Sequence, residues 1–277
     1  MTALVDVVWI AFLAGAATGI GALPVFVTDR ISHRFYDAAV GLAAGIMVGA
    51  AVFALVVPGL ELGSLWEVVV GLLLGAVFLL VGNWAIPHIH LVVAGEGEET
   101  YPPAARSEAV VEADIESNTP ITTDDSEGDG RRALLVGSAV TIHNVPEGLA
   151  IGIAFAGGLE GVGTALAIAI AIQNVPDGFA MAIPASRTGL SKTKTVLYTT
   201  LSGAVPEPIA AAFGFALVAV VTGLFPIAAG FAAGTMIAVV FREMIPASHG
   251  HGYADIATLT FVVGFVVMVI VDVGLAV

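Results

Sequence analysis

Apolar runs of about 20 residues constrain this chain more than any other feature, because that length of helix crosses a lipid bilayer. Eight such runs can be laid out, over about 5–27, 36–60, 65–87, 132–156, 160–184, 194–222, 225–246 and 255–276. Pro206 and Pro208 interrupt the sixth run, so we expect a kinked or tilted helix there. With 58% hydrophobic and 12% charged residues, the chain is expected to be an all-α membrane protein with eight transmembrane helices.

The basic residues indicate the orientation of these spans. All nine lie at alternate junctions, namely Arg30 and Arg34 after span 1, Arg106, Arg131 and Arg132 between spans 3 and 4, Arg187, Lys192 and Lys194 between spans 5 and 6, and Arg242 at the end of span 7. Because short cytoplasmic loops carry the excess of Lys and Arg, both termini are expected outside the cell, in a multi-pass plasma-membrane protein. The start MTALVDVVWIAFLAG lacks a basic leader, so we interpret it as the first span, not a signal peptide.

One long junction differs from the rest of the chain. Of the 23 acidic residues, 11 fall between Glu96 and Asp129, in a polar stretch without periodicity. This composition predicts three regions: spans 1–3 in residues 1–93, an acidic flexible cytoplasmic loop over 94–131, and spans 4–8 in 132–277. The loop is typical of a solvated segment in a salt-adapted organism, and a metal-collecting role is the alternative.

Two near-copies of one polar hexapeptide lie inside spans 4 and 5. They are His143-Asn-Val-Pro-Glu-Gly148 and Gln173-Asn-Val-Pro-Asp-Gly178. Polar side chains in hydrocarbon cost several kcal/mol unless they are paired or coordinated. In each copy the first residue and the acid are four positions apart, so they share one helix face. The chain has no cysteine, and imidazole with carboxylate oxygen suits Zn²⁺ and its first-row neighbours.

A purely structural interpretation of the hexapeptides remains open, in which Asn and Gln only join helices by hydrogen bonds. A weaker third copy, Val205-Pro206-Glu207, follows at the same spacing of about thirty residues, though Val and Pro are common enough in membrane helices for coincidence. The prolines free backbone carbonyls and the glycines allow close helix contact, both of which fit helices that line a polar site. We therefore predict a cation site between spans 4 and 5.

HNVPEG and QNVPDG together resemble the signature of the ZIP (zinc- and iron-regulated-transporter-like) family of divalent-metal transporters. GLAAGIMVGAAVFALVVPGLE in span 2, PHIH at the end of span 3 and the Glu-bearing spans 6 and 7 resemble its GufA-like prokaryotic branch. The resemblance covers the whole chain, including the eight spans and the variable loop after span 3. It implies an alternating-access transporter with a two-metal type of centre.

The resemblance also implies roles for individual residues. The positions that match metal ligands are Met47, His143, Asn144, Glu147, Gln173, Asn174, Asp177 and Glu207, with Glu147 as a bridge and Asn144 at the second metal. Glu243 and Asp272 match acidic positions of the exit route and span 8, and the family pattern supports His88 and His90. Glu61 faces outside and could attract cations. Each of these residues also has a simpler interpretation. Met47 could serve only in packing, Asp272 and the histidine pairs could lie at the membrane interface, and Glu61 could simply be exposed. His249 and His251 form a second such pair.

Three departures from the family pattern affect the expected chemistry. Asp177 stands where Glu is usual, so its carboxylate reaches about one methylene less far. Asn174 stands where the GufA-like branch can carry Asp, which removes one charge from the centre. Arg242 stands where His often precedes the span-7 acid, and a cation there would oppose metal binding at Glu243.

The function expected from these observations is uptake of divalent metal ions into the cytoplasm, without enzymatic activity. Zn²⁺ is the expected cargo, and broad transport of Cd²⁺, Fe²⁺ or Mn²⁺ is the alternative. An intramembrane metallohydrolase is the alternative class, but that chemistry uses an HExxH-like helix and the order here is HNxxE. A retinal-type receptor is excluded because both lysines lie between spans. The expected partners are divalent ions and the lipid bilayer; no nucleic acid is expected, and a homodimer is one state the chain allows.

Overall fold

The computed structural model describes residues 2–28, 32–94, 143–186, 190–221 and 223–275, and these ranges are almost entirely helical. Seven helical stretches in them are long and apolar enough to cross a membrane: Leu4–Phe26, His33–Leu62, Leu65–Gly82, Glu160–Ala182, Lys192–Val220, Phe225–His249 and Ala254–Leu275. These agree with seven of the eight predicted spans. Of the remaining one, expected over 132–156, the structure describes residues 143–156, which are helical. The predicted loop over 94–131 lies outside the described residues except for Ala94.

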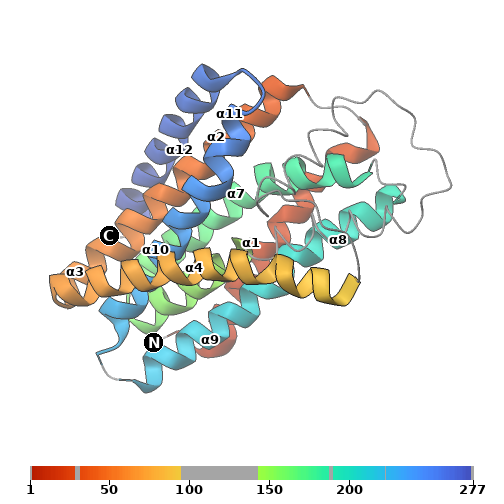
Figure 1. Cartoon of the computed structure of the whole chain (residues 1–277). Coiled ribbons are helices and arrows are strands. Elements are labelled where there is room, and N and C mark those ends of the chain that lie inside the picture. Colours follow the sequence, from red (N-terminus) through yellow and green to blue (C-terminus); the bar gives the residue numbers. More distant parts are fainter. Residues whose placement is uncertain (1, 29–31, 95–142, 187–189, 222, 276–277) are drawn as a thin grey trace.

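The spans are built from the following elements. They are α1 (Leu4–Ala22) with the 3₁₀ turn η1 (Leu23–Phe26), α2 (His33–Ala50), the π-helix η2 (Ala51–Val56), α3 (Val57–Leu62), α4 (Leu65–Ala94), the helical segment 143–156, α7 (Glu160–Ser186), α8 (Lys192–Ala204), α9 (Pro206–Val220), α10 (Phe225–Val239), the π-helix η3 (Val240–Met244), α11 (Ile245–His249) and α12 (Ala254–Leu275). In Figure 1, the N-terminus lies in the lower part of the view, the C-terminus lies at its left side near mid-height, and the α11–α12 connection lies near the top.

Segment 143–156 lies in the centre of the bundle, whereas α4 and α12 lie at its edge. Ala150, Ile151 and Ala154 of the segment have no exposed surface. By contrast, only 17% of the α12 window is buried, and large apolar side chains such as Val262 and Ile270 remain exposed along it. An apolar outer surface around a polar interior is what a bilayer requires.

Glycines set the distance between the helices. α2 packs along α12, α10 along α4, and α1 along α7 and α8. A Cβ on Gly178 would collide with the Thr18 carbonyl of α1, and one on Gly148 would collide with the backbone of α9. Both hexapeptide glycines therefore allow close helix contact, as predicted, and membrane helices commonly associate through such small residues.

Candidate metal centre

The two hexapeptides meet through a direct side-chain hydrogen bond. Gln173 Nε2 of α7 donates to Glu147 Oε1 of segment 143–156 over 2.5 Å. Both side chains have no exposed surface. The predicted approach of spans 4 and 5 at these residues is therefore what the structure shows.

The third Val-Pro-acid copy belongs to the same cluster. The amide nitrogen of Asn174 donates to Glu207 Oε1 over 2.8 Å and to the Ala14 carbonyl over 2.9 Å. Asn174 and Glu207 are fully buried, at the place where α9 begins. One asparagine thus joins α7 to α1 and to α9, and it brings the Glu207 carboxylate beside the hexapeptides.

The kink in the sixth span is part of this arrangement. α8 ends at Ala204 and α9 begins at Pro206, as the two prolines predict. Pro206 has no N–H, so it cannot donate to the carbonyl of Ser202 four residues earlier. Asn144 supplies the missing donor, with Nδ2 lying 2.7 Å from that carbonyl oxygen. The amide group of Asn144 therefore stabilises the helix break.

Unpaired oxygen atoms concentrate in this cluster. Among the described residues, Glu147 Oε2, Gln173 Oε1, Asn174 Oδ1 and Glu207 Oε2 are buried and have no hydrogen-bond partner. Asp177 lies close enough to Glu147 and Glu207 for the charges to interact. Buried carboxylates are costly unless a cation or a proton compensates them. The two unpaired carboxylate oxygens, with the Asp177 carboxylate near them, form an arrangement that attracts a cation, and the two amide oxygens are further potential ligands.

His143 contacts a carboxylate that helix spacing alone did not indicate. Its Nε2 pairs with Glu243 Oε2 of the π-helix η3, 100 residues further along the chain. It remains an electrostatic neighbour of Asp177. Arg242 is exposed beside this pair. Glu243, expected on the exit route, is thus directly linked to the first residue of the span-4 hexapeptide.

The other predicted site residues lie in varied places. Met47 is buried near the end of α2, where its carbonyl accepts from the first residue of η2. Glu61 is exposed, and Asp272 is partly buried with one oxygen, Oδ1, unpaired. The side chains of His88 and His90 lie outside the described residues. Among the described side chains, no three His, Asp or Glu groups already surround a common point, so amide oxygens are needed to complete a metal site in the cluster.

One buried acid was missed by the sequence interpretation. Asp37 on the second turn of α2 has no exposed surface, and its Oδ1 lies 2.7 Å from His251 Nδ1. The signal was present, because His33 and Asp37 have the same four-residue spacing as His143 and Glu147. The signal is weak, however, because Asp37 lies near the end of a predicted span, where an acid is ordinary.

Comparison with known proteins gives a consistent result. The family model described as ZIP Zinc transporter matches residues 5–272. The zinc transporter GufA of Myxococcus xanthus is 34% identical over 272 residues, covering 95% of this chain and 96% of that protein. Zinc transporter ZIP11 of Homo sapiens is 32% identical, with 95% of each chain covered. Zinc transporter ZIPB of Bordetella bronchiseptica is 35% identical, covering 94% of this chain and 78% of its own. With a family match over nearly its whole length and relatives above 30% identity, this membrane protein belongs to the ZIP zinc transporter family.

Proposed function

We propose that this protein carries Zn²⁺ across the cell membrane into the cytoplasm through the buried cluster between spans 4 and 5. The single observation that carries the proposal is the group of four unpaired oxygens on Glu147, Gln173, Asn174 and Glu207. Relatives that are named zinc transporters support the choice of metal. Cd²⁺, Fe²⁺ and Mn²⁺ are the competing cargoes, since carboxylate and imidazole ligands bind all of them.

The ligands divide into charged and neutral groups. In this proposal Glu147, Asp177 and Glu207 supply carboxylate oxygens, and Glu147 bridges two ions. Gln173 and Asn174 now direct their NH₂ groups at the carboxylates. A half-turn of each amide exchanges nitrogen for oxygen with little change in shape. In this proposal the amides turn when an ion enters, so their oxygens join its ligands, while Asn144 keeps its structural bond.

Transfer toward the cytoplasm uses the His143–Glu243 pair. Zn²⁺ binds both imidazole and carboxylate, so an ion in the cluster competes for the two partners of this pair. When His143 turns to the ion, Glu243 becomes available as the next acceptor along the exit route. The π-helices η2 and η3 lie directly after α2 and α10, and such irregular turns often occur at functional sites.

The topology belongs to the same proposal. Residues 132–156 form the fourth of eight spans, both termini lie outside, and the acidic loop over 94–131 lies in the cytoplasm. Opening the cluster alternately to the two sides requires helices to move against one another. The break between Ala204 and Pro206 is a natural point for such movement, because one backbone bond across it is replaced by a side-chain bond.

Zn²⁺ uptake into proteoliposomes tests the assignment. His143→Ala and Glu147→Ala should each abolish uptake, with expression and membrane insertion unchanged. Glu67→Gln is the control, because Glu67 lies at the start of α4, away from the cluster, and accepts hydrogen bonds from Ser64. Uptake at the wild-type rate in either site variant would refute the assignment. Parallel assays with Cd²⁺, Fe²⁺ and Mn²⁺ rank the cargoes.

A further inference from the structure

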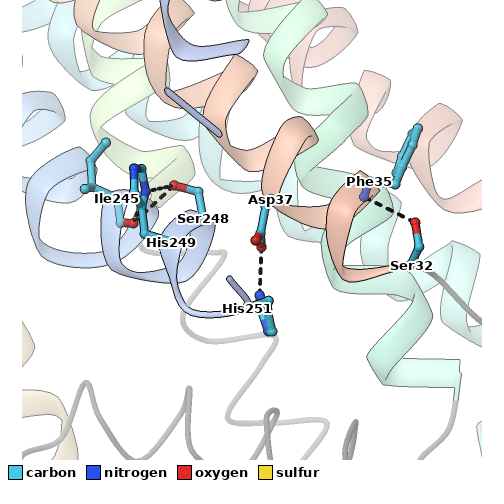
Figure 2. A network of polar contacts seen from close by, with 7 residues as sticks. All are labelled: Ser32, Phe35, Asp37, Ile245, Ser248, His249 and His251. Carbon is cyan, nitrogen blue, oxygen red and sulfur yellow. Dashed lines mark hydrogen bonds and ion pairs between the residues drawn. The ribbon is translucent and has the colours of Figure 1, made fainter. Parts of the chain in front are cut away.

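A second buried polar group lies at the end of the bundle where α2 begins and α11 joins α12. Asp37 accepts a hydrogen bond from His251 Nδ1 over 2.7 Å, and the two residues are 214 positions apart. Figure 2 shows the His251 ring below Asp37, pointing up to its carboxylate. Gly252, at φ 87°, turns the chain directly after this histidine.

The hydrogen bond fixes the chemistry of the imidazole. An ionised carboxylate can only accept, so Nδ1 of His251 carries a proton, and whenever the ring is neutral its Nε2 presents a lone pair. That Nε2 is buried and has no partner, and neither does Asp37 Oδ2. A histidine whose one nitrogen is held by a carboxylate while the other is open is the usual arrangement of a metal-ligating histidine.

A second imidazole lies against the first. The His33 and His251 rings stack with centroids 4.5 Å apart and planes inclined by 26°. His33 begins α2 and precedes Asp37 by one helical turn, so both belong to the same face of that helix. His33 therefore supplies a second imidazole in direct contact with the ring that carries the unpaired Nε2.

The neighbouring histidine provides a contrast. Both ring nitrogens of His249 have partners: Nδ1 faces Ser248 Oγ at 2.9 Å and the Ile245 carbonyl at 3.0 Å, and Nε2 faces Thr258 Oγ1 at 3.3 Å. His249 therefore turns toward its own helix in Figure 2, and His251 turns toward α2. The two rings therefore face different partners in this structure.

We propose that His251 and His33 form a second divalent-cation site, separate from the cluster of spans 4 and 5. Asp37 acts as the positioning carboxylate that orients His251, and water completes the coordination. Two imidazoles with a carboxylate behind them select Zn²⁺ and similar borderline ions over Mg²⁺ or Ca²⁺. In the proposed topology this end of the bundle faces the cytoplasm, so the site would bind the ion after it has crossed.

Metal binding to purified full-length protein tests this site. His251→Asn is the decisive substitution, because the Asn amide can donate to Asp37 in place of Nδ1 but offers nothing in place of Nε2. It is made in the Glu147→Ala background, so that binding at the central cluster does not obscure the result. His249→Asn in the same background is the matched control, and thermal unfolding verifies that each variant is folded.

The expected result is that Glu147→Ala protein still binds Zn²⁺ by elemental analysis, that His251→Asn removes this ion and that His249→Asn retains it. Asp37→Asn should weaken the affinity by about 10- to 100-fold, in a chelator-competition titration, without removing the ion. Equal Zn²⁺ binding with and without His251→Asn would overturn the proposal, as would Glu147→Ala protein that binds none. The central site fails by a different result, namely normal uptake in the Glu147→Ala variant.

Discussion

Replacing Asn174 with Asp tests how strongly this residue controls the charge of the central cluster. Its amide nitrogen donates to Glu207 Oε1 over 2.8 Å and to the Ala14 carbonyl over 2.9 Å. In Asn174→Asp, one carboxylate oxygen replaces the NH₂ group that supplies both N–H donors. The new carboxylate then faces the Glu207 carboxylate and the Ala14 carbonyl in a buried site. The family's GufA-like branch, which the hexapeptides resemble, can carry Asp here, so the fold is expected to accept the side chain.

The magnitude follows from the two lost bonds and the new repulsion. Losing a hydrogen bond to a charged group costs about 1.5–3 kcal/mol, and one to a carbonyl costs about 1 kcal/mol. Interhelical bonds in membranes average only about 0.6 kcal/mol, so the low end applies. Two carboxylates about 4 Å apart repel by about 4 kcal/mol at an effective dielectric constant of about 20. The repulsion is therefore the larger effect, and it is removed when a cation lies between the groups.

The assay is Zn²⁺ stoichiometry and affinity in purified protein. Relief of the repulsion should tighten binding by between about tenfold and about a thousandfold, and should favour a second bound ion. Without Zn²⁺ the variant should unfold at a lower temperature than wild type. Adding Zn²⁺ should raise the unfolding temperature of the variant by more than it raises that of wild type. Asn174→Ala separates the causes, because it removes the same two bonds and adds no charge. Wild-type affinity and stoichiometry in Asn174→Asp would show that position 174 does not face the ion, and the reasoning would be wrong.

Three further predictions concern the loop, the packing and the ligand reach. Deleting most of 96–129 should slow Zn²⁺ uptake only modestly, since the segment contains no histidine; complete loss in a correctly inserted protein would contradict this. Gly148→Ala should lower thermal stability by about 1–3 kcal/mol, because its Cβ would meet the backbone of α9, whereas Gly82→Ala, whose Cβ would have no described atom within 4 Å, should be neutral. Asp177→Glu should change metal preference in competition uptake more than it changes the unfolding temperature, and the reverse result would place Asp177 outside the site.

Much of the architecture could be predicted from the sequence because a bilayer leaves few choices. A run of about 20 apolar residues must be helical, since its backbone has no water to bond, and seven such spans appear where the sequence placed them. Pro206 predicted the break in the sixth span for an equally local reason, its missing N–H. The hexapeptides marked themselves as a site because polar groups in hydrocarbon need partners.

What the sequence could not determine is which partner each polar group has. Helix spacing places His143 and Glu147 on one face but does not show that the His143 ring pairs with Glu243, or that Asp37 pairs with His251 from the far end of the chain. These helices are apolar around nearly their whole circumference, so no polar stripe shows which face meets which neighbour. Steric contacts decide instead: Gly148 against α9 and Gly178 against α1 fix the approach that sets Asn174 between Glu207 and Ala14. Apolar length and polar composition are properties of each segment, so they reveal the spans and the residues that need compensation; where the charges and unpaired oxygens meet depends on how distant helices pack.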